Sequence, residues 1–370
     1  MTRALRIGTA LGAGLSLLAL VGCGVPTLGT GAVDGGSLEA SATLNPLKAL
    51  VLRDAKDSFS AYDDNHDGVL THAEVPFMRS ASFDALDANH DGRITWQESA
   101  PTGSQLKVLL ESSAKALTQL FTKLDKNGDH TLEASERAAA DYLVTGPGES
   151  ADLTFDGFVA ALERGATNVY AERVVQSDRP PVVMVPGWFL PTAIWIPLAK
   201  KLKDRGYVNQ ITVPHWPSFG DIRDYAAAAA YRTQRIQAQT GAKHVEAIGH
   251  SMGGLVLRYF IKHLGGDQVV SHYVSFGTPQ HGTVIGKLWP CTSTDQMLPG
   301  SDFLTELNAG DETPSPVKYT SIRTNTDEIV LSETSPILEG AENFLVPTAL
   351  HLEMVWDPRA QKIALEALTK

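Results

Sequence analysis

The segment 245–255, which reads V-E-A-I-G-H-S-M-G-G-L, constrains the fold of this chain more than any other. A strand-like apolar run leads into G-x-S-x-G, and a helix-like run over 252–263 follows. This order predicts a sharp strand-to-helix turn that holds Ser251 at its tip, with Gly249 and Gly253 leaving space for the turn. A serine hydroxyl is a poor nucleophile unless a base lies within reach, so the turn makes Ser251 a candidate nucleophile. The alternative is a small-residue turn with an incidental serine.

Strand-like and helix-like segments alternate through 179–370, which is typical of an α/β fold. The chain has 370 residues, enough for two domains, and a linker with two prolines lies at 176–181. We expect 179–370 to form a mostly parallel sheet in a three-layer αβα domain. Besides the strand before Ser251, the expected strands are 181–185, 210–213, 269–276, 317–323 and 343–347, and the expected helices are 194–205, 221–239, 252–263 and 358–370.

An internal repeat occupies the part of the chain before this domain. The segments F-S-A-Y-D, F-D-A-L-D and F-T-K-L-D each end in an aspartate that opens a loop rich in side-chain oxygens. The loops 63–74 and 87–98 match D-x-[DN]-x-[DN]-G-x5-E at every position. Two complete loops 24 residues apart resemble EF-hands. The alternative, solvated acidic turns, does not account for this spacing.

The loop spacing suits calcium, a hard cation that takes about six to eight oxygen ligands. In each loop the seventh residue would offer a backbone carbonyl and the final glutamate both of its oxygens. We also expect Leu70 and Ile94 to pair as short strands between the loops. The candidate ligands are Asp63, Asn65, Asp67, Val69, Thr71 and Glu74 in the first loop, and Asp87, Asn89, Asp91, Arg93, Thr95 and Glu98 in the second.

A third loop departs from the pattern, because His130 stands where the turn favours glycine. Gly128, two residues earlier, is expected to relieve the backbone. A fourth hand, around 153–158, looks vestigial because Gly157 replaces the glutamate, and we expect it to pair with the third. Residues 46–175 are thus expected to form an all-α EF-hand domain. The candidate ligands of the third loop are Asp125, Asn127, Asp129, Thr131 and Glu136, with Glu133 as a further oxygen donor.

Charge is distributed unevenly along the chain, whose net charge is −11. Residues 24–178 contain 24 acidic and 12 basic residues, so the acidity gathers in the EF-hand part. A chain with this balance is a poor partner for nucleic acid, which binds clustered Lys and Arg. Calcium is plentiful outside cells, and extracellular modules bind it with dissociation constants of about 10⁻⁴ to 10⁻³ M. We therefore expect calcium to be structural rather than a switch.

The first residues are expected to form a targeting signal rather than part of the fold. Arg3 and Arg6 precede a short apolar run at 7–19, and L-V-G-C ends at Cys23. This pattern resembles a bacterial lipoprotein signal at 1–22, with lipid on Cys23 and a flexible tether over 23–45. The resemblance implies a lipid-anchored protein of the cell envelope, at the outer membrane or cell surface. The alternatives are an ordinary signal peptide with a chance cysteine, or an uncleaved anchor. Cys291, the other cysteine, is expected to be a structural thiol in a loop.

A reactive serine needs a histidine base and an acid that orients the histidine, in the chain order Ser, Asp or Glu, His in α/β-hydrolases. Asp327 follows the expected strand 317–323, and His351 is the only histidine after His281. His250 is expected to pack within the turn rather than act as the base. The rival acids, expected to be solvated surface residues, are Glu328, Glu333 and Glu353.

Several motifs together resemble the small lidless bacterial lipases of the lipase A type. They are P-V-V-M-V-x-G from 181, G-H-S-M-G-G from 249, G-T-P-x-H-G-T from 277, Y-T-S-I from 319 and L-H-L from 350. The resemblance covers nearly all of 179–370 and implies a Ser251, Asp327 and His351 triad. It also implies that the backbone N–H groups of Trp188 and Met252 form the oxyanion hole. Pro186 stands where that family has histidine, which leaves the shape of this loop open.

The resemblance implies a serine hydrolase that cleaves carboxylic esters of lipids, with calcium in the EF-hand domain, and we expect a monomer. One alternative keeps the chemistry but transfers or removes an acyl group on a specialised partner. Another is a calcium-dependent surface adhesion or scaffold protein with an inactive hydrolase fold. We expect 281–313 to carry a short cap over the site. Apolar residues that either line a cleft or belong to the core are Trp188, Phe189, Leu190, Trp195 and Ile196.

Overall fold

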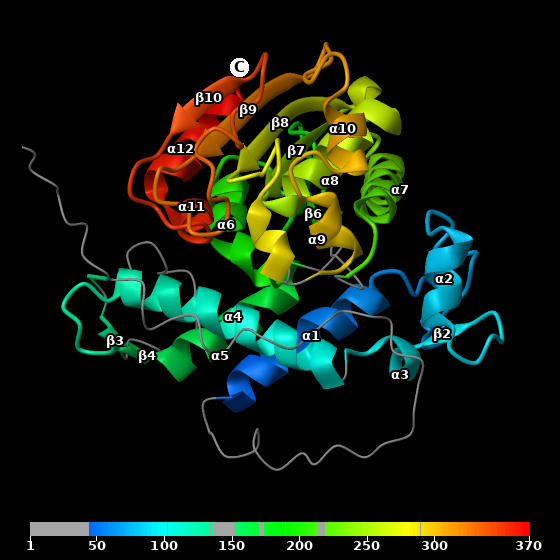
Figure 1. Ribbon diagram of the computed structural model, residues 1–370, viewed down its shortest axis with the longest axis horizontal. Helices are drawn as coiled ribbons and strands as arrows, with labels where there is room; N and C mark the ends of the chain where they lie inside the picture. The colour runs from blue at the N-terminus through cyan, green and yellow to red at the C-terminus, as the bar shows by residue number, and fades with distance from the viewer. Residues whose placement is uncertain are drawn as a thin grey trace, which may run out of the picture.

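The computed structural model describes residues 44–370 except 102, 134, 137–151, 170–173, 189, 214–218 and 289. The predictions for Cys23, for the signal segment and for most of the tether lie outside the described residues, as does Phe189. The described chain forms a helical N-terminal domain and a sheet-containing C-terminal domain that lies against it (Figure 1). Within the described ranges, no helix has both the length and the apolar character needed to cross a membrane.

The N-terminal domain is built from helices and two short strand pairs, as the repeat predicts. Leu70 pairs with Ile94 in one antiparallel pair, and Leu132 pairs with Leu153 in the other. The second pair confirms that the vestigial fourth hand partners the third. The elements are α1 (Leu44–Ser60), β1 (Val69–Leu70), α2 (Ser80–Leu86), β2 (Ile94–Thr95), α3 (Trp96–Ser99), α4 (Gly103–Leu124), β3 (Thr131–Leu132), β4 (Leu153–Thr154) and α5 (Phe155–Val169).

The C-terminal domain is organised around a six-stranded sheet with the order β10-β9-β8-β7-β5-β6. Every pairing in this sheet is parallel, which confirms the α/β prediction. Parallel strands require crossover connections, and each of these except the one from β9 to β10 contains a helix. The strands lie close to their expected bounds: β5 (Val182–Val185), β6 (Gln210–Thr212), β7 (Val245–His250), β8 (Val270–Phe276), β9 (Lys318–Arg323) and β10 (Glu342–Leu345).

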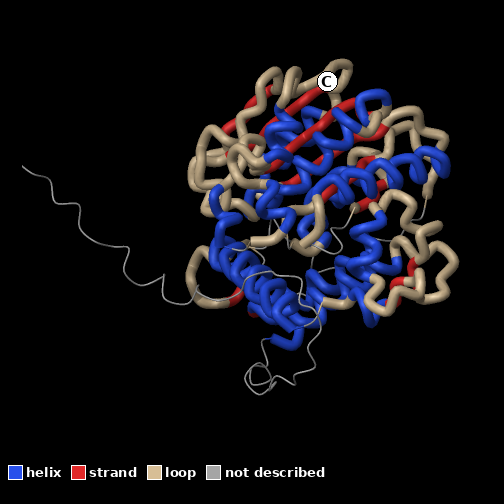
Figure 2. Tube along the Cα trace, turned by 45° about the vertical axis from the view of Figure 1, so that its right-hand side comes forward, coloured by secondary structure: helices blue, strands red, loops and turns tan. Residues whose placement is uncertain are grey.

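Helices cover both faces of the sheet, so the domain has three layers (Figure 2). Side chains of a strand alternate between faces, and those of β5 divide accordingly. Val183 and Val185 pack in the cluster that contains α7 (Ile222–Thr240) and α8 (Met252–His263). Val182 and Met184 pack in the cluster on the other face. That face carries α6 (Ile196–Asp204), α11 (Glu353–Trp356) and α12 (Pro358–Ala367), and the 3₁₀ helix η3 (Thr192–Trp195) precedes α6.

The expected cap segment contains three short helical pieces. They are η5 (Val284–Leu288), α9 (Thr292–Gln296) and α10 (Asp302–Asn308). The Trp188 indole Nε1 donates to Ser293 Oγ at 3.1 Å, so α9 lies against the loop that follows β5. Cys291, directly before α9, is buried and forms no disulfide.

The two domains share one hydrophobic core rather than meeting at a thin hinge. Helices α1, α4 and α5 contribute to the same buried cluster as α6, α11 and α12. The ring of Phe158 meets that of Trp356 edge-on, with the ring centroids 5.9 Å apart. Burying apolar area stabilises a fold by about 25 cal/mol per Å². Separating the domains would expose this apolar surface to water and lose that stabilisation.

A second contact joins the two complete EF-hand loops to α7. Arg79, between the loops, donates from Nε to Asp224 Oδ1 at 2.6 Å and lies 2.7 Å from Asp221 Oδ2. Ser82 also donates to Asp224, and Arg235 pairs with Asp64 of the first loop. Asp221 is the N-cap of α7, so Arg79 contacts the C-terminal domain at a helix end, while Asp64 contacts α7 further along.

Candidate active site

Ser251 occupies the sharp turn that the sequence predicts between β7 and α8. Its backbone has φ 53° and ψ −126°, a region that residues with a side chain rarely adopt. The Ser251 N–H donates to the carbonyl of Phe276 on the neighbouring strand at 2.8 Å, which fixes the turn against β8. Strained backbone of this kind persists where the surrounding structure enforces it, and it often accompanies function.

The surrounding glycines give the turn its space. A Cβ added at Gly253 would lie 2.1 Å from the carbonyl oxygen of Val185 and 2.4 Å from that of Pro186. One added at Gly187 would lie 3.0 Å from the Cβ of Ser251. The start of α8 therefore packs directly on the backbone that leaves β5, and the motif's glycines are required by close approach.

His351 and Asp327 form a buried pair on loops that follow β10 and β9. The ring Nδ1 of His351 lies 2.8 Å from Asp327 Oδ2, and both side chains are nearly inaccessible. Asp327 Oδ1 accepts the N–H groups of Ile329 and Val330 at 2.9 and 2.6 Å. The carboxylate is therefore fixed, and it orients the imidazole by the bond to Nδ1.

The two groups shift each other's pKa. Burial would raise the pKa of Asp327, but His351 and the two backbone N–H groups outweigh it, so the pKa lies below its ordinary value. Burial would lower the pKa of His351, but Asp327 and then Glu328 outweigh it, so that pKa is raised. The arrangement therefore stabilises an imidazolium beside an ionised aspartate.

His250 packs within the turn, as expected. It is fully buried, and its Nε2 donates to the backbone carbonyl of His351 at 3.1 Å. Burial lowers the pKa of His250 to about 3, so the ring is neutral at ordinary pH. Its part is to hold the backbone of the histidine loop.

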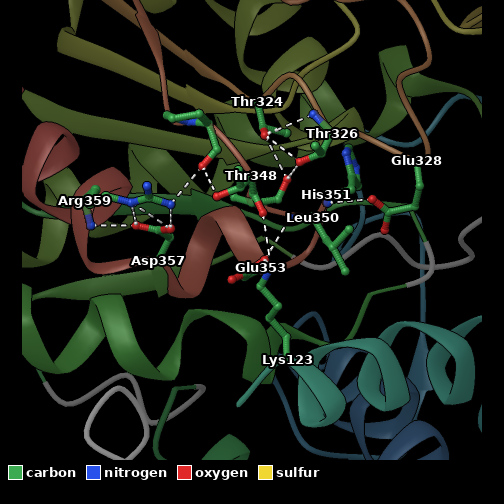
Figure 3. A network of polar contacts seen from close by, with 12 residues as sticks. Lys123, Thr324, Thr326, Glu328, Thr348, Leu350, His351, Glu353, Asp357 and Arg359 are labelled. Carbon is green, nitrogen blue, oxygen red and sulfur yellow. Dashed lines mark hydrogen bonds and ion pairs between the residues drawn. The ribbon is translucent and has the colours of Figure 1, made fainter. Parts of the chain in front are cut away.

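Two of the rival acids are not solvated surface residues, and the structure corrects that prediction (Figure 3). Glu328 Oε2 accepts the backbone N–H of His351 at 3.0 Å, and Glu353 Oε2 accepts that of Leu350 at 2.9 Å. A loop that carries unpaired backbone N–H groups needs acceptors, and these carboxylates supply them. Glu333 is exposed, as expected.

Further polar contacts hold the same loop. The Thr324 and Thr326 hydroxyls both donate to the carbonyl of Ala349, at 2.8 and 2.7 Å. Lys123, at the end of α4 in the N-terminal domain, donates to the carbonyl of Thr348 at 3.3 Å and lies 3.9 Å from Glu353 Oε2 (Figure 3). The EF-hand domain thus contacts the segment that carries His351.

One candidate oxyanion donor follows Ser251 in the chain, and the other lies in the loop after β5. Met252 is the first residue of α8, where backbone N–H groups have no partner within the helix. Trp188 follows Gly187, which lies against Ser251. Trp195 is fully buried and packs near Phe276, with ring centroids 6.4 Å apart, so it belongs to the core rather than to a cleft.

The first two EF-hand loops fit calcium. Asp63 Oδ2 accepts the N–H of Gly68 at 2.9 Å, and Asp87 Oδ2 accepts that of Gly92 at 2.8 Å, so each loop wraps around its first aspartate. Oε2 of each final glutamate accepts from a threonine of its own loop, Thr71 or Thr95. The other oxygen of each, Oε1, is buried with no hydrogen-bond partner among the described residues. A buried, unpartnered carboxylate oxygen facing such a loop suits a cation.

The threonines at position nine orient these glutamates. The hydroxyl and N–H of Thr71 both donate to Glu74 Oε2, and those of Thr95 donate to Glu98 Oε2, at distances from 2.8 to 3.0 Å. Within the described ranges no group of three Asp, Glu, His or Cys side chains is arranged to hold a metal alone. An EF-hand ligand set also draws on asparagine and backbone oxygens.

The third loop also wraps around its first aspartate, Asp125, but it differs from the other two at His130 and at Glu136. His130 adopts φ 67° although Gly128 also has a positive φ, so the earlier glycine does not spare the histidine. The His130 N–H still donates to Asp125 Oδ2 at 2.9 Å, as the glycines do in the other loops. Glu136 Oε1, however, accepts the N–H of Lys126 at 2.7 Å. Its final glutamate is thus engaged by the loop's own backbone.

Known protein families match the C-terminal and the N-terminal part of the chain separately. Residues 179–353 match the model of the family described as lipase (class 2), and residues 55–75 and 78–98 each match an EF-hand model. Among solved structures, lipase B of Aspergillus fumigatus is 20% identical, with 86% of this chain and 85% of that chain covered and a TM-score of 0.49. The mature form of lipase BlEst2 of Bacillus licheniformis is 17% identical, with 53% and 94% covered and a TM-score of 0.45.

The packing at Gly253 generates a prediction. Gly253→Ala should destabilise the chain by about 3 kcal/mol, because the added methyl group meets two carbonyl oxygens at a site that cannot expand. The measurement is urea unfolding followed by circular dichroism. Gly157→Ala is the matched control, since it is also helical and its nearest neighbours lie 3.5 Å away. Equal unfolding midpoints for the two variants would contradict the account of the turn.

Proposed function

We propose that Ser251, His351 and Asp327 hydrolyse esters of lipids, in a carboxylic ester hydrolase whose residues 179–353 match the class 2 lipase family and follow two EF-hand matches. The observation that carries this proposal is the buried bond of 2.8 Å between His351 Nδ1 and Asp327 Oδ2, on loops beside the Ser251 turn. That bond fixes which ring nitrogen is left for the serine.

The proposed reaction is a two-step acyl transfer. Ser251 Oγ attacks the ester carbonyl while His351 Nε2 takes its proton, and the imidazolium is stabilised by Asp327. The oxyanion binds the backbone N–H groups of Trp188 and Met252. His351 then protonates the departing alcohol, which leaves an acyl group on the serine. Water attacks this acyl-enzyme with the same histidine as base, releasing the acid and restoring the hydroxyl.

We further propose that the first two EF-hand loops bind calcium and brace the catalytic domain. The support is the buried, unpartnered Oε1 of Glu74 and Glu98 in loops that match the ligand pattern at every position. A bound calcium ion would neutralise the loop carboxylates and fix the loop's shape. Because Arg79 and Asp64 link these loops to α7, ordering the loops stabilises the contact between domains. The third loop is proposed to bind more weakly, since its Glu136 is already bonded to backbone N–H groups.

The place of action is proposed from the N-terminal sequence alone. Lipid on Cys23 and a tether over 23–45 would keep the enzyme at the cell envelope, at the outer membrane or cell surface. This position suits substrates that lie in or near a membrane.

Hydrolysis of p-nitrophenyl esters by the full chain in detergent tests the reaction. The wild-type chain should cleave them, and Ser251→Ala should lower kcat at least about 10³-fold, because the remaining groups supply only binding and oxyanion stabilisation. Ser104→Ala, at an exposed serine of α4, is the control and should leave kcat unchanged. Hydrolysis that survives in Ser251→Ala would contradict the proposal. Acyl transfer to an added alcohol that is much faster than hydrolysis by water would also contradict it.

Thermal unfolding tests the calcium brace. Saturating calcium at about 100 times its dissociation constant should stabilise the folded chain by about 2.7 kcal/mol per site, and a chelator should remove that gain. Glu98→Gln should lose the calcium-dependent stabilisation of one site, because an amide offers one neutral oxygen where calcium takes two carboxylate oxygens. Glu111→Gln, an exposed residue of α4, is the control. Unfolding that is insensitive to calcium would refute the brace.

A further inference from the structure

Glu328 has no part in the reaction described so far, yet it contacts the catalytic histidine. It follows Asp327 directly in the chain, and its Oε2 accepts the backbone N–H of His351 at 3.0 Å (Figure 3). Two consecutive carboxylates therefore serve one histidine, one at the ring and one at the backbone. A side chain that reaches a partner 23 residues along the chain is a specific contact, not a local turn.

The backbone of His351 is fixed at both of its polar groups. Glu328 accepts its N–H, and its carbonyl accepts a bond from His250 Nε2. The ring Nδ1 is bonded to Asp327. With three directions fixed, the remaining nitrogen, Nε2, has one orientation, and small errors in such an orientation cost catalysis heavily.

We propose that Glu328 is a positioning residue that holds the His351 backbone in the catalytic orientation through its carboxylate oxygen. This inference rests on the proposed Ser251, His351 and Asp327 mechanism. Glu328 acts in two ways. Its hydrogen bond needs only an acceptor oxygen, and its negative charge acts through space.

The charge has a predictable sign. The titratable groups beside His351 are Asp327 and Glu328 on the β9 loop and neutral His250 at the end of β7. Both carboxylates raise the pKa of His351. The reaction needs the neutral imidazole, so a raised pKa places the acid limb of kcat/KM at higher pH. Removing the charge of Glu328 should therefore move that limb to lower pH.

Two variants distinguish the effects. Glu328→Gln keeps an acceptor oxygen and removes the charge, so it should retain the kcat of the alkaline plateau within about twofold while its acid limb moves to lower pH. Glu328→Ala removes both, so it should also lower kcat about tenfold with KM unchanged, since a buried N–H is left unpaired. The measurement is the pH profile of kcat and kcat/KM for a p-nitrophenyl ester. Glu333→Gln, an exposed acid of the same loop, should match the wild type.

Several results would overturn the proposal. Wild-type kcat in Glu328→Ala would show that the hydrogen bond does not matter. An equal loss of kcat in Glu328→Gln and Glu328→Ala would show that charge, not the acceptor, is responsible. Thermal unfolding identifies a variant that fails to fold, and Glu328→Gln then decides the question by its pH profile. Failure of the proposed mechanism itself is separate, because Ser251→Ala would then retain activity.

Discussion

The strained turn at Ser251 is the constraint on which the rest of the site depends. Ser251 has φ 53°, and the turn it occupies brings the start of α8 against the backbone that leaves β5. At Gly253 this approach leaves no room for a methyl group. The parallel sheet then brings the loops after β9 and β10 to the same edge, because carboxyl ends of parallel strands point the same way. Asp327 and His351 arrive beside the turn by that geometry. The elements on either side of the turn, β7 and α8, are buried in the core.

The N-terminal domain belongs to this arrangement rather than being appended to it. Its helices share a hydrophobic cluster with α6, α11 and α12, and α11 begins two residues after His351. Lys123 contacts the histidine loop, and Arg79 contacts the start of α7. Exposed ion pairs contribute little individually, about 0 to 1 kcal/mol, so the shared core carries the association and the ion pairs fix its register. Calcium bound as proposed would act on catalysis through stability.

Much of this was predictable because it rests on local patterns. The alternation of strand-like and helix-like segments predicted the sheet and helices of 179–370, and the loop spacing predicted the pairing of Leu70 with Ile94. The prediction for Glu328 failed because its partner is a backbone N–H of a separate loop, 23 residues along the chain, which no local pattern shows. Glu353 instead accepts the N–H of Leu350, three residues before it, and that local contact was missed. Trp195 was ambiguous because its burial is decided by α5, α6 and β8 together. The conformation of His130 was missed because Gly128 offered a simpler account.

The central claim is that Ser251 is a nucleophile activated by His351. The direct measurement is reaction of the full chain with a fluorophosphonate, followed by mass spectrometry of tryptic peptides. Ser251 is the only serine of the peptide 244–258, so an adduct there is unambiguous. The account predicts one adduct, on that peptide, which forms far more slowly in His351→Ala. An adduct on another serine, or an unchanged rate without the histidine, would contradict it.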